Sequence, residues 1–229
     1  MKFLAIFALL CTCVRAETLT DVLARMDQAA QSFRALSGKM HRVQFTAVLN
    51  ESSAMDGMLR LKRVNKTTVG IVEFLPPEPR PADAKIDRTV YVNGKNIQVY
   101  YPKANTLEIY DASKYVANID QFLLLGFGTT SAELMKFYAL KLGGTEQVAG
   151  KMCSRIELTP TTPQMKTLVT KIELWIPDGE ANPVREKVTE PSKNYELVDY
   201  SDIQLNPSLP DSSFELHLPK GVKTVHPQK

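Results

Sequence analysis

Cysteine and histidine are scarce in this 229-residue chain, which has three of each. Two of the cysteines, Cys11 and Cys13, lie in an N-terminal run that we expect to be removed, so only Cys153 remains and no internal disulfide can form. Cys153 lies in an alternating segment, which is typical of a small buried side chain and not of a nucleophile.

The motifs of the common enzyme classes are also lacking. None of the three histidines lies at metal-ligand spacing from another, and no HExxH, CxxC or GxSxG motif is present beyond residue 16. We therefore expect a protein that is not an enzyme and that carries no cofactor and no metal.

Long hydrophobic runs are lacking too. The longest, Phe3–Val14, is too short to cross a bilayer as a helix. It follows the short basic start Met1-Lys2 and precedes the small-x-small tripeptide Val14-Arg15-Ala16, which together are typical of a secretory signal peptide. We expect residues 1–16 to be that signal and residues 17–229 to form a single domain that is secreted across the inner membrane; the resemblance described below implies the periplasm as its location.

A lipoprotein signal that uses Cys11 or Cys13 is the alternative. Leu10 and Thr12 precede these cysteines, and neither is the small residue that such a signal prefers. We rank this alternative below simple cleavage after Ala16.

Charge of one sign is not in large excess. The formal net charge is +3, and cleavage after Ala16 would remove two basic residues and no acidic one. A nearly neutral chain without a basic stripe is not expected to bind nucleic acid.

Two regions have the spacing of helices. Apolar residues recur at steps of three and four over Thr18–Leu36, and Ser37-Gly38 is expected to end that helix. Ser113–Tyr138 returns to helical spacing, is interrupted by Gly126-Phe127-Gly128 and resumes at a Thr130–Glu133 capping box.

The rest of the chain alternates with period two, which predicts strands joined by short turns such as Asn93-Gly94. The expected strands are Met40–Leu49, Met58–Arg63, Thr68–Phe74, Thr89–Val92, Ile97–Tyr101, Thr106–Tyr110, Ala139–Val148, Met152–Leu158, Thr167–Ile176, Val184–Glu190, Tyr195–Ile203 and Phe214–Leu218. We expect a mainly β (α+β) fold: an unclosed antiparallel β-barrel of about eleven strands, with helices covering its concave apolar face.

One strand ends in an unexpected residue. In the stretch GMLRLKRVN, alternation places Leu59, Leu61 and Arg63 on one face. Either the strand ends at Lys62 and Arg63 reaches water from the turn, or Arg63 points inward and its donors need acceptors.

Several segments, in order, resemble the LolA-type family of periplasmic lipoprotein carriers and relatives such as LolB. They are DVLARMDQAAQSFRALSG, GMLRLKRVN, VYVNGKNIQVYYP, IELTP, KIELWI and FELHLPKGVKTV. The resemblance implies an unclosed β-barrel whose apolar cavity holds the acyl chains of lipoproteins.

The resemblance also implies roles for particular residues. Arg63 matches the position of an arginine that contacts the covering helices and helps to gate the cavity, and such a contact suits a two-state lid. The candidate cavity residues are Val43, Phe45, Leu59, Leu61, Val90, Val92, Ile97 and Val99. The candidate lid residues are Leu23, Met26, Ile119, Phe122, Leu123 and Phe127.

Two functions remain open. The first is a monomeric carrier that takes acylated lipoproteins to the outer membrane, with an inner-membrane release complex and an outer-membrane receptor as the partners that the resemblance implies. The second is a carrier of another lipid, or a lipoprotein-sensing regulatory protein, on the same fold. The residues of the 75–81 proline-rich loop favour a stiff connector over a binding motif.

Overall fold

The computed structural model describes residues 17–65, 67–111 and 125–227. The expected signal peptide and most of the first helix expected within Ser113–Tyr138 lie outside these residues. The helical elements are α1 (Leu19–Ser32), η1 (Pro102–Ala104), α3 (Ser131–Leu134), α4 (Pro163–Leu168) and η3 (Asp211–Phe214). None of the described helices is both long enough and apolar enough to cross a membrane.

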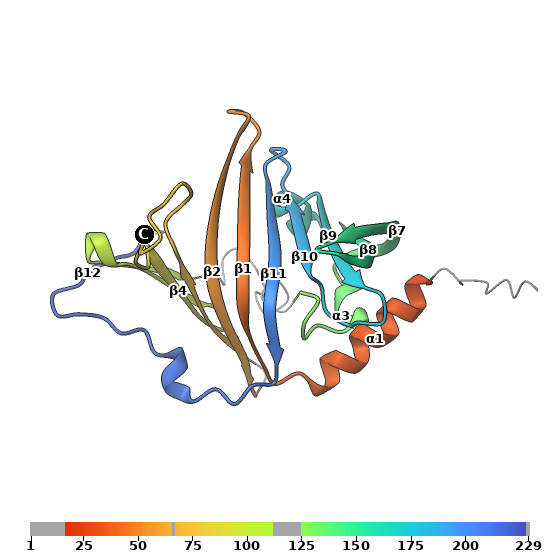
Figure 1. The fold of residues 1–229 in the computed structure, drawn as a ribbon, viewed down its shortest axis with the longest axis horizontal. Coiled ribbons are helices and arrows are strands. Elements are labelled where there is room, and N and C mark those ends of the chain that lie inside the picture. Colours follow the sequence, from red (N-terminus) through yellow and green to blue (C-terminus); the bar gives the residue numbers. More distant parts are fainter. Residues whose placement is uncertain (1–16, 66, 112–124, 228–229) are drawn as a thin grey trace, which may run out of the picture.

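Twelve strands form one sheet (Figure 1). They are β1 (Ala35–Thr46), β2 (Glu51–Val64), β3 (Thr67–Phe74), β4 (Arg88–Asn93), β5 (Asn96–Tyr101), β6 (Thr106–Asp111), β7 (Tyr138–Val148), β8 (Lys151–Pro160), β9 (Lys171–Pro177), β10 (Arg185–Thr189), β11 (Tyr195–Leu205) and β12 (Lys223–Val225).

The sheet is open, as the sequence predicts. Its order is β12-β6-β5-β4-β3-β2-β1-β11-β10-β9-β8-β7, so the end strands β12 and β7 do not pair with each other. Among the described strands, every pairing is antiparallel except that of β12 with β6, which is parallel. The expected mainly β, unclosed architecture is confirmed, and the sheet has twelve strands where about eleven were expected.

The helix α1 begins where the sequence predicts and ends earlier. The Thr18 side chain accepts a hydrogen bond from the Asp21 backbone, and the Asp21 carboxylate accepts one from the Thr18 backbone, which forms a capping box. The expected extension to Leu36 is wrong because Phe33 is already extended and β1 starts at Ala35. Leu36 instead pairs with Leu61 in the sheet, where it is fully buried.

The pairing register divides the side chains of the sheet between two faces. We call the face that carries Leu61, Leu174 and their paired neighbours the inner face, and the opposite one the outer face. The helix α1 lies against the inner face of the half of the sheet formed by β7–β10 (Figure 1). The cluster there, which we call the α1 cluster, contains Val22, Leu23, Met26, Leu125, Leu134, Tyr138, Ile156, Leu158, Met165, Val169, Ile172, Leu174 and Ile176.

A second, smaller cluster lies on the inner face of β1 and β2. It joins Phe33, Leu36, Leu59, Leu61 and Phe127. The two halves of the inner face are therefore covered differently: a helix of 14 residues lies over one, and single side chains lie over the start of the other.

Three strand predictions have wrong bounds. The strand expected at Met40–Leu49 ends at Thr46, and the one expected at Met58–Arg63 already starts at Glu51, because β1 and β2 form a long hairpin through a turn at 47–50. Residues 167 and 168 end α4, so β9 starts at Lys171 and not at Thr167.

The expected strand Phe214–Leu218 is not formed. Phe214 ends η3 and is buried beside Lys62, whose ammonium nitrogen lies 4.6 Å from the ring centroid. The final strand is β12, which pairs with β6 at the edge of the sheet.

Replacing Leu174 by Ala is expected to test the α1 cluster. Its side chain is fully buried there, so the cavity should lower the free energy of unfolding by about 2–5 kcal/mol. The control is Leu49→Ala in the turn between β1 and β2, where Leu49 is 63% exposed and the expected change is below about 0.5 kcal/mol. Urea denaturation measures both, and equal effects would contradict the assignment of the core.

Candidate functional site

Six of the eight candidate cavity residues share the inner face. Cross-strand pairs connect Leu59 to Val72, Val72 to Val90 and Val90 to Val99. The next row runs from Leu61 through Gly70 and Val92 to Ile97. The predicted rows are therefore continuous over β2–β5.

Val43 and Phe45, which the sequence predicts in the cavity, lie on the outer face. Paired residues share a face, and the partners of these two on β2 are Ala54 and Ser52, which alternate with the inner residues. Phe45 stacks on Tyr195 of the neighbouring strand, with ring centroids 4.9 Å apart, on the outer face. Leu36 faces inward, so alternation along β1 places Val43 and Phe45 on the outer face.

The lid residues divide between the two halves of the sheet. Phe127 packs on the cluster with Leu59 and Leu61 and meets the Tyr200 ring edge-on, at 5.1 Å between centroids. Leu23 and Met26 are buried in the α1 cluster, so they cover β7–β10 and not the predicted cavity strands. Ile119, Phe122 and Leu123 lie outside the described residues.

Arg63 lies within β2 and points inward. Its Nη2 donates a hydrogen bond of 2.5 Å to the carbonyl oxygen of Gly128, and its guanidinium lies 5.5 Å from the Phe33 ring centroid. Its backbone N–H donates to the carbonyl oxygen of Arg34 at 2.8 Å, which continues the pairing to the end of the strand. Of the two readings of Arg63, the inward one agrees with the structure; its gating role stays a prediction.

The acceptor of Arg63 belongs to a segment, 125–134, that we call the covering segment. Gly128 allows the close approach, because a Cβ there would lie 2.8 Å from a Phe33 ring carbon and 3.1 Å from Arg63 Nη2. Gly126 has φ +77°, and a Cβ on it would lie 2.7 Å from the Pro183 ring. The two glycines therefore allow this segment to pack closely against Phe33, Arg63 and Pro183.

The covering segment is also tied to α1. Asp27 accepts hydrogen bonds from the backbone N–H of Ser131 at 2.5 Å and from its hydroxyl at 2.6 Å. The capping box of Thr130 and Glu133, predicted from the sequence, starts α3 next to this contact. A carboxylate at the first turn of a helix interacts favourably with its unpaired N–H groups.

Glu186 is a buried acid on the inner face that sequence reasoning missed. It pairs across the sheet with Leu174 and Val198, and the Tyr200 hydroxyl donates to its carboxylate at 3.0 Å. Burial raises the pKa of Glu186 to about 8, against the smaller lowering effect of the Tyr200 hydrogen bond. The acid is therefore protonated at neutral pH, beside the tyrosine that contacts Phe127.

Two arginines on the inner face were also missed. Arg42 pairs with Met55 across β1 and β2, and Arg88 pairs with Phe74 across β3 and β4. Counting alternate residues from Leu36 along β1 would have placed Arg42 inward, in the set that excludes Val43 and Phe45. Arg88 could be placed only once the β3–β4 register was known.

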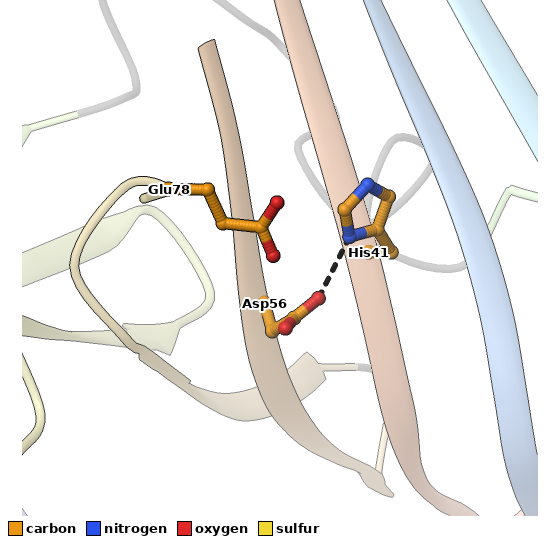
Figure 2. Close-up of side chains that lie close together, drawn as sticks. All are labelled: His41, Asp56 and Glu78. Atoms are coloured by element: carbon orange, nitrogen blue, oxygen red, sulfur yellow. Dashed lines mark hydrogen bonds and ion pairs between the residues drawn. The ribbon is translucent and has the colours of Figure 1, made fainter. Parts of the chain in front are cut away.

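A group of possible metal ligands lies on the outer face. Figure 2 shows His41 from β1, Asp56 from β2 and Glu78 from the loop after β3, and one ligand atom of each lies within 4.8 Å of the others. His41 Nδ1 is 2.7 Å from an Asp56 oxygen. The guanidinium of Arg80 also contacts Asp56 and lies 3.2 Å from Glu78, so a cation already pairs with both carboxylates.

This group holds the 75–81 loop against β2. The backbone N–H of Leu75 donates to the Asp56 carbonyl at 2.9 Å, and that of Glu78 donates to the Ala54 carbonyl at 2.8 Å. Burial raises the pKa of Asp56, but the hydrogen bond from His41 and the charge of Arg80 outweigh it and lower the pKa overall. We interpret the group as an ion-pair network that anchors a stiff connector.

The fold is one open sheet, and helical segments cover part of its inner face. The chain belongs to the family described as "Predicted periplasmic protein (DUF2092)", whose sequence profile matches residues 79–226. No curated protein matches the chain.

Several solved structures are similar to the chain. An uncharacterized conserved protein from Thermus thermophilus is 12% identical, with 90% of this chain and 98% of that chain covered and a TM-score of 0.53. A LolA superfamily protein from Nitrosomonas europaea is 16% identical over 88% and 99% of the two chains, with a TM-score of 0.41. Lipoprotein LppX from Mycobacterium tuberculosis is 16% identical over 84% and 99%, with a TM-score of 0.45.

Replacing Arg63 by Leu is expected to loosen the covering segment. The Gly128 carbonyl would lose its charged donor, which costs about 1–3 kcal/mol locally when the group stays buried. Hydrogen–deuterium exchange of residues 125–130 should become faster. The control is Arg60→Leu, since Arg60 is on the outer face and pairs with Glu73; faster exchange in the control alone would contradict the account.

Replacing Glu186 by Gln is expected to flatten the pH dependence of stability. An acid whose pKa rises from 4.5 to about 8 on folding holds a proton in the native state that the unfolded state has lost, so stability falls as pH rises between these values. The slope contributed is at most about 1.4 kcal/mol per pH unit.

Urea midpoints at pH 5 and pH 7.5 measure this difference, with Glu190→Gln at an exposed turn as the control. The wild type and the control should lose stability between the two pH values by the same amount, and Glu186→Gln should lose less. An unchanged slope in Glu186→Gln would contradict the assignment of Glu186 as a buried neutral acid.

Proposed function

We propose that this protein is a periplasmic carrier that binds the acyl chains of lipoproteins on the inner face of β2–β5 and takes them to the outer membrane. The observation that carries the proposal is the pair of apolar rows through Leu59 and Leu61, which run across four strands beyond the part of the sheet that α1 fills. Acyl chains bind such a surface by burial, at about 0.8 kcal/mol for each methylene group.

The covering segment supports a carrier because it meets these rows where they start, through one apolar side chain and one hydrogen bond. Phe127 packs on Leu59 and Leu61, and Arg63 bonds to Gly128 next to it. A hydrogen bond to one carbonyl contributes about 1.5–3 kcal/mol when the donor is charged, so ligand contacts of similar size can replace it. Arg63 is the residue that we propose as the gate.

The proposal is for a binding protein and not an enzyme, with no cofactor. Cys153 is fully buried beside Trp175, and burial raises the pKa of its thiol, so the thiolate needed of a nucleophile is disfavoured. Cleavage of residues 1–16 would release a soluble domain, 17–229, that passes between an inner-membrane release complex and an outer-membrane receptor.

A carrier of another lipid is the second candidate, and the arginines of the inner face favour it. Arg42 and Arg88 face the same side of the sheet as the apolar rows. A purely hydrocarbon ligand would offer their guanidinium groups no hydrogen-bond acceptor. The two candidates share the binding surface and differ in the cargo.

Native mass spectrometry of the mature protein, purified from a membrane-containing extract, tests the proposal. We expect a bound triacylated lipoprotein, and a reduced or altered load in Arg63→Leu relative to Arg60→Leu. A free lipid in its place would support the second candidate. A protein that is empty after extraction, and that takes up no lipid when mixed with vesicles, would contradict both.

A further inference from the structure

Two guanidinium groups meet on the inner face above the apolar rows. Arg42 Nη1 lies 3.9 Å from the sulfur of Met55, and Arg88 Nη2 lies 3.0 Å from the same sulfur. Both groups also lie over the Phe74 ring, at 5.8 and 4.8 Å from its centroid. Because they share one sulfur and one ring, a single small anion can reach both.

The partners that hold these two groups are weak ones. A thioether sulfur is a poor hydrogen-bond acceptor, and an aromatic ring attracts a cation without accepting its N–H groups in a fixed direction. Arg42 Nε is buried without a hydrogen-bond partner among the described residues. The Arg42 Nε–H and the weakly held N–H groups of the two arginines can therefore donate to an acceptor that binds from outside the chain.

The two arginines differ in how closely a carboxylate approaches them. Glu196 contacts Arg42 directly. Among the described residues, the carboxylate within ion-pair range of Arg88 is that of Asp87, at 3.9 Å, and Asp87 lies equally far from Lys103. Glu108 faces inward two strands away and accepts a 2.7 Å hydrogen bond from Tyr110.

The apolar rows continue directly from the two arginines. Phe74 and Gly57 are paired, and the next pair along the same strands on the same face is Val72 with Leu59. Arg88 is followed on the inner face of β4 by Val90 and then Val92. A charged site therefore lies at one end of the surface on which we propose that acyl chains bind.

We propose that Arg42 and Arg88 bind the anionic headgroup of a lipid whose acyl chain lies along Val90, Val92 and Val99. The inference rests on the proposed function and specifies its ligand class, an amphiphile with a phosphate or carboxylate group. Arginine suits this role because its planar fork of donors matches two oxygens of either group. Both side chains are shielded from water, with exposed fractions of 18% for Arg42 and 21% for Arg88.

A fluorescent fatty acid and its methyl ester test the headgroup directly. cis-Parinaric acid and methyl cis-parinarate share one chain and differ in the charge, so their dissociation constants for the wild-type protein isolate the contribution of the anion. We expect the acid to bind at least tenfold more tightly than the ester. Arg42→Gln and Arg88→Gln should each remove most of that preference and leave the affinity for the ester unchanged.

The matched control is Arg60→Gln. Arg60 lies on the outer face, has a side chain that is 26% exposed and pairs with Glu73 at 2.8 Å, so its loss removes a similar charge from the other side of the sheet. This variant should keep the preference for the acid. Arg88→Lys retains a charge and should restore part of the preference, which separates loss of charge from disturbed packing.

The outcomes separate the two proposals. Equal binding of acid and ester by the wild type, or a preference that survives in Arg88→Gln, would overturn the headgroup site and leave acyl-chain binding intact. No binding of either probe would overturn the proposed function and this inference with it. Competition by dodecyl phosphate and by laurate then identifies the anion, since the stronger competitor carries the headgroup that fits the two arginines.

Discussion

The packing of α1 on the inner face of β8 and β9 is the interaction on which the rest of the structure depends. An open sheet presents an apolar face that must be covered, and here Val22 and Met26 cover it beside Ile172 and Leu174. The capping box at Thr18 fixes where the helix starts, and the early turn at Phe33 directs the chain into β1. Because α1 is short, it fills one half of the inner face and leaves the rows on β2–β5 to a different cover.

The covering segment differs from α1 in how it is held. Leu125 and Leu134 are buried in the α1 cluster, and Phe127 between them packs on Leu59 and Leu61. Asp27 and Arg63 add hydrogen bonds to Ser131 and Gly128. The covering segment therefore connects the half of the sheet formed around Leu174 to the start of the apolar rows on β2.

Much of the fold could be predicted from the sequence, because strands and amphipathic helices have clear periods. Leu59, Leu61, Val90 and Val99 were placed correctly since each lies in a strand with an uninterrupted pattern and short turns fix its neighbours. The start of α1 was predictable because the capping box of Thr18 and Asp21 is formed by residues close in sequence.

The polar part of the inner face could not be predicted in the same way. On β1 both sets of alternate residues are mixed, so only the pairing of Leu36 with Leu61 shows that Arg42 faces inward and Phe45 outward. Glu186 is buried by strands that are distant in sequence, and nothing in its local pattern indicates this. Phe214–Leu218 alternates like a strand, but Phe214 packs beside the Lys62 ammonium group. The strand at the edge of the sheet is β12.

The central claim is that acyl chains bind the inner face of β2–β5, and neighbouring residues on one strand test it most directly. Val90 faces inward and Tyr91 outward, since their partners on β5 are Val99 and Gln98. A photo-crosslinking phenylalanine derivative at position 90 should attach to a radiolabelled acyl chain, and the same derivative at position 91 should not. Labelling at both positions alike, or at position 91 alone, would contradict the account.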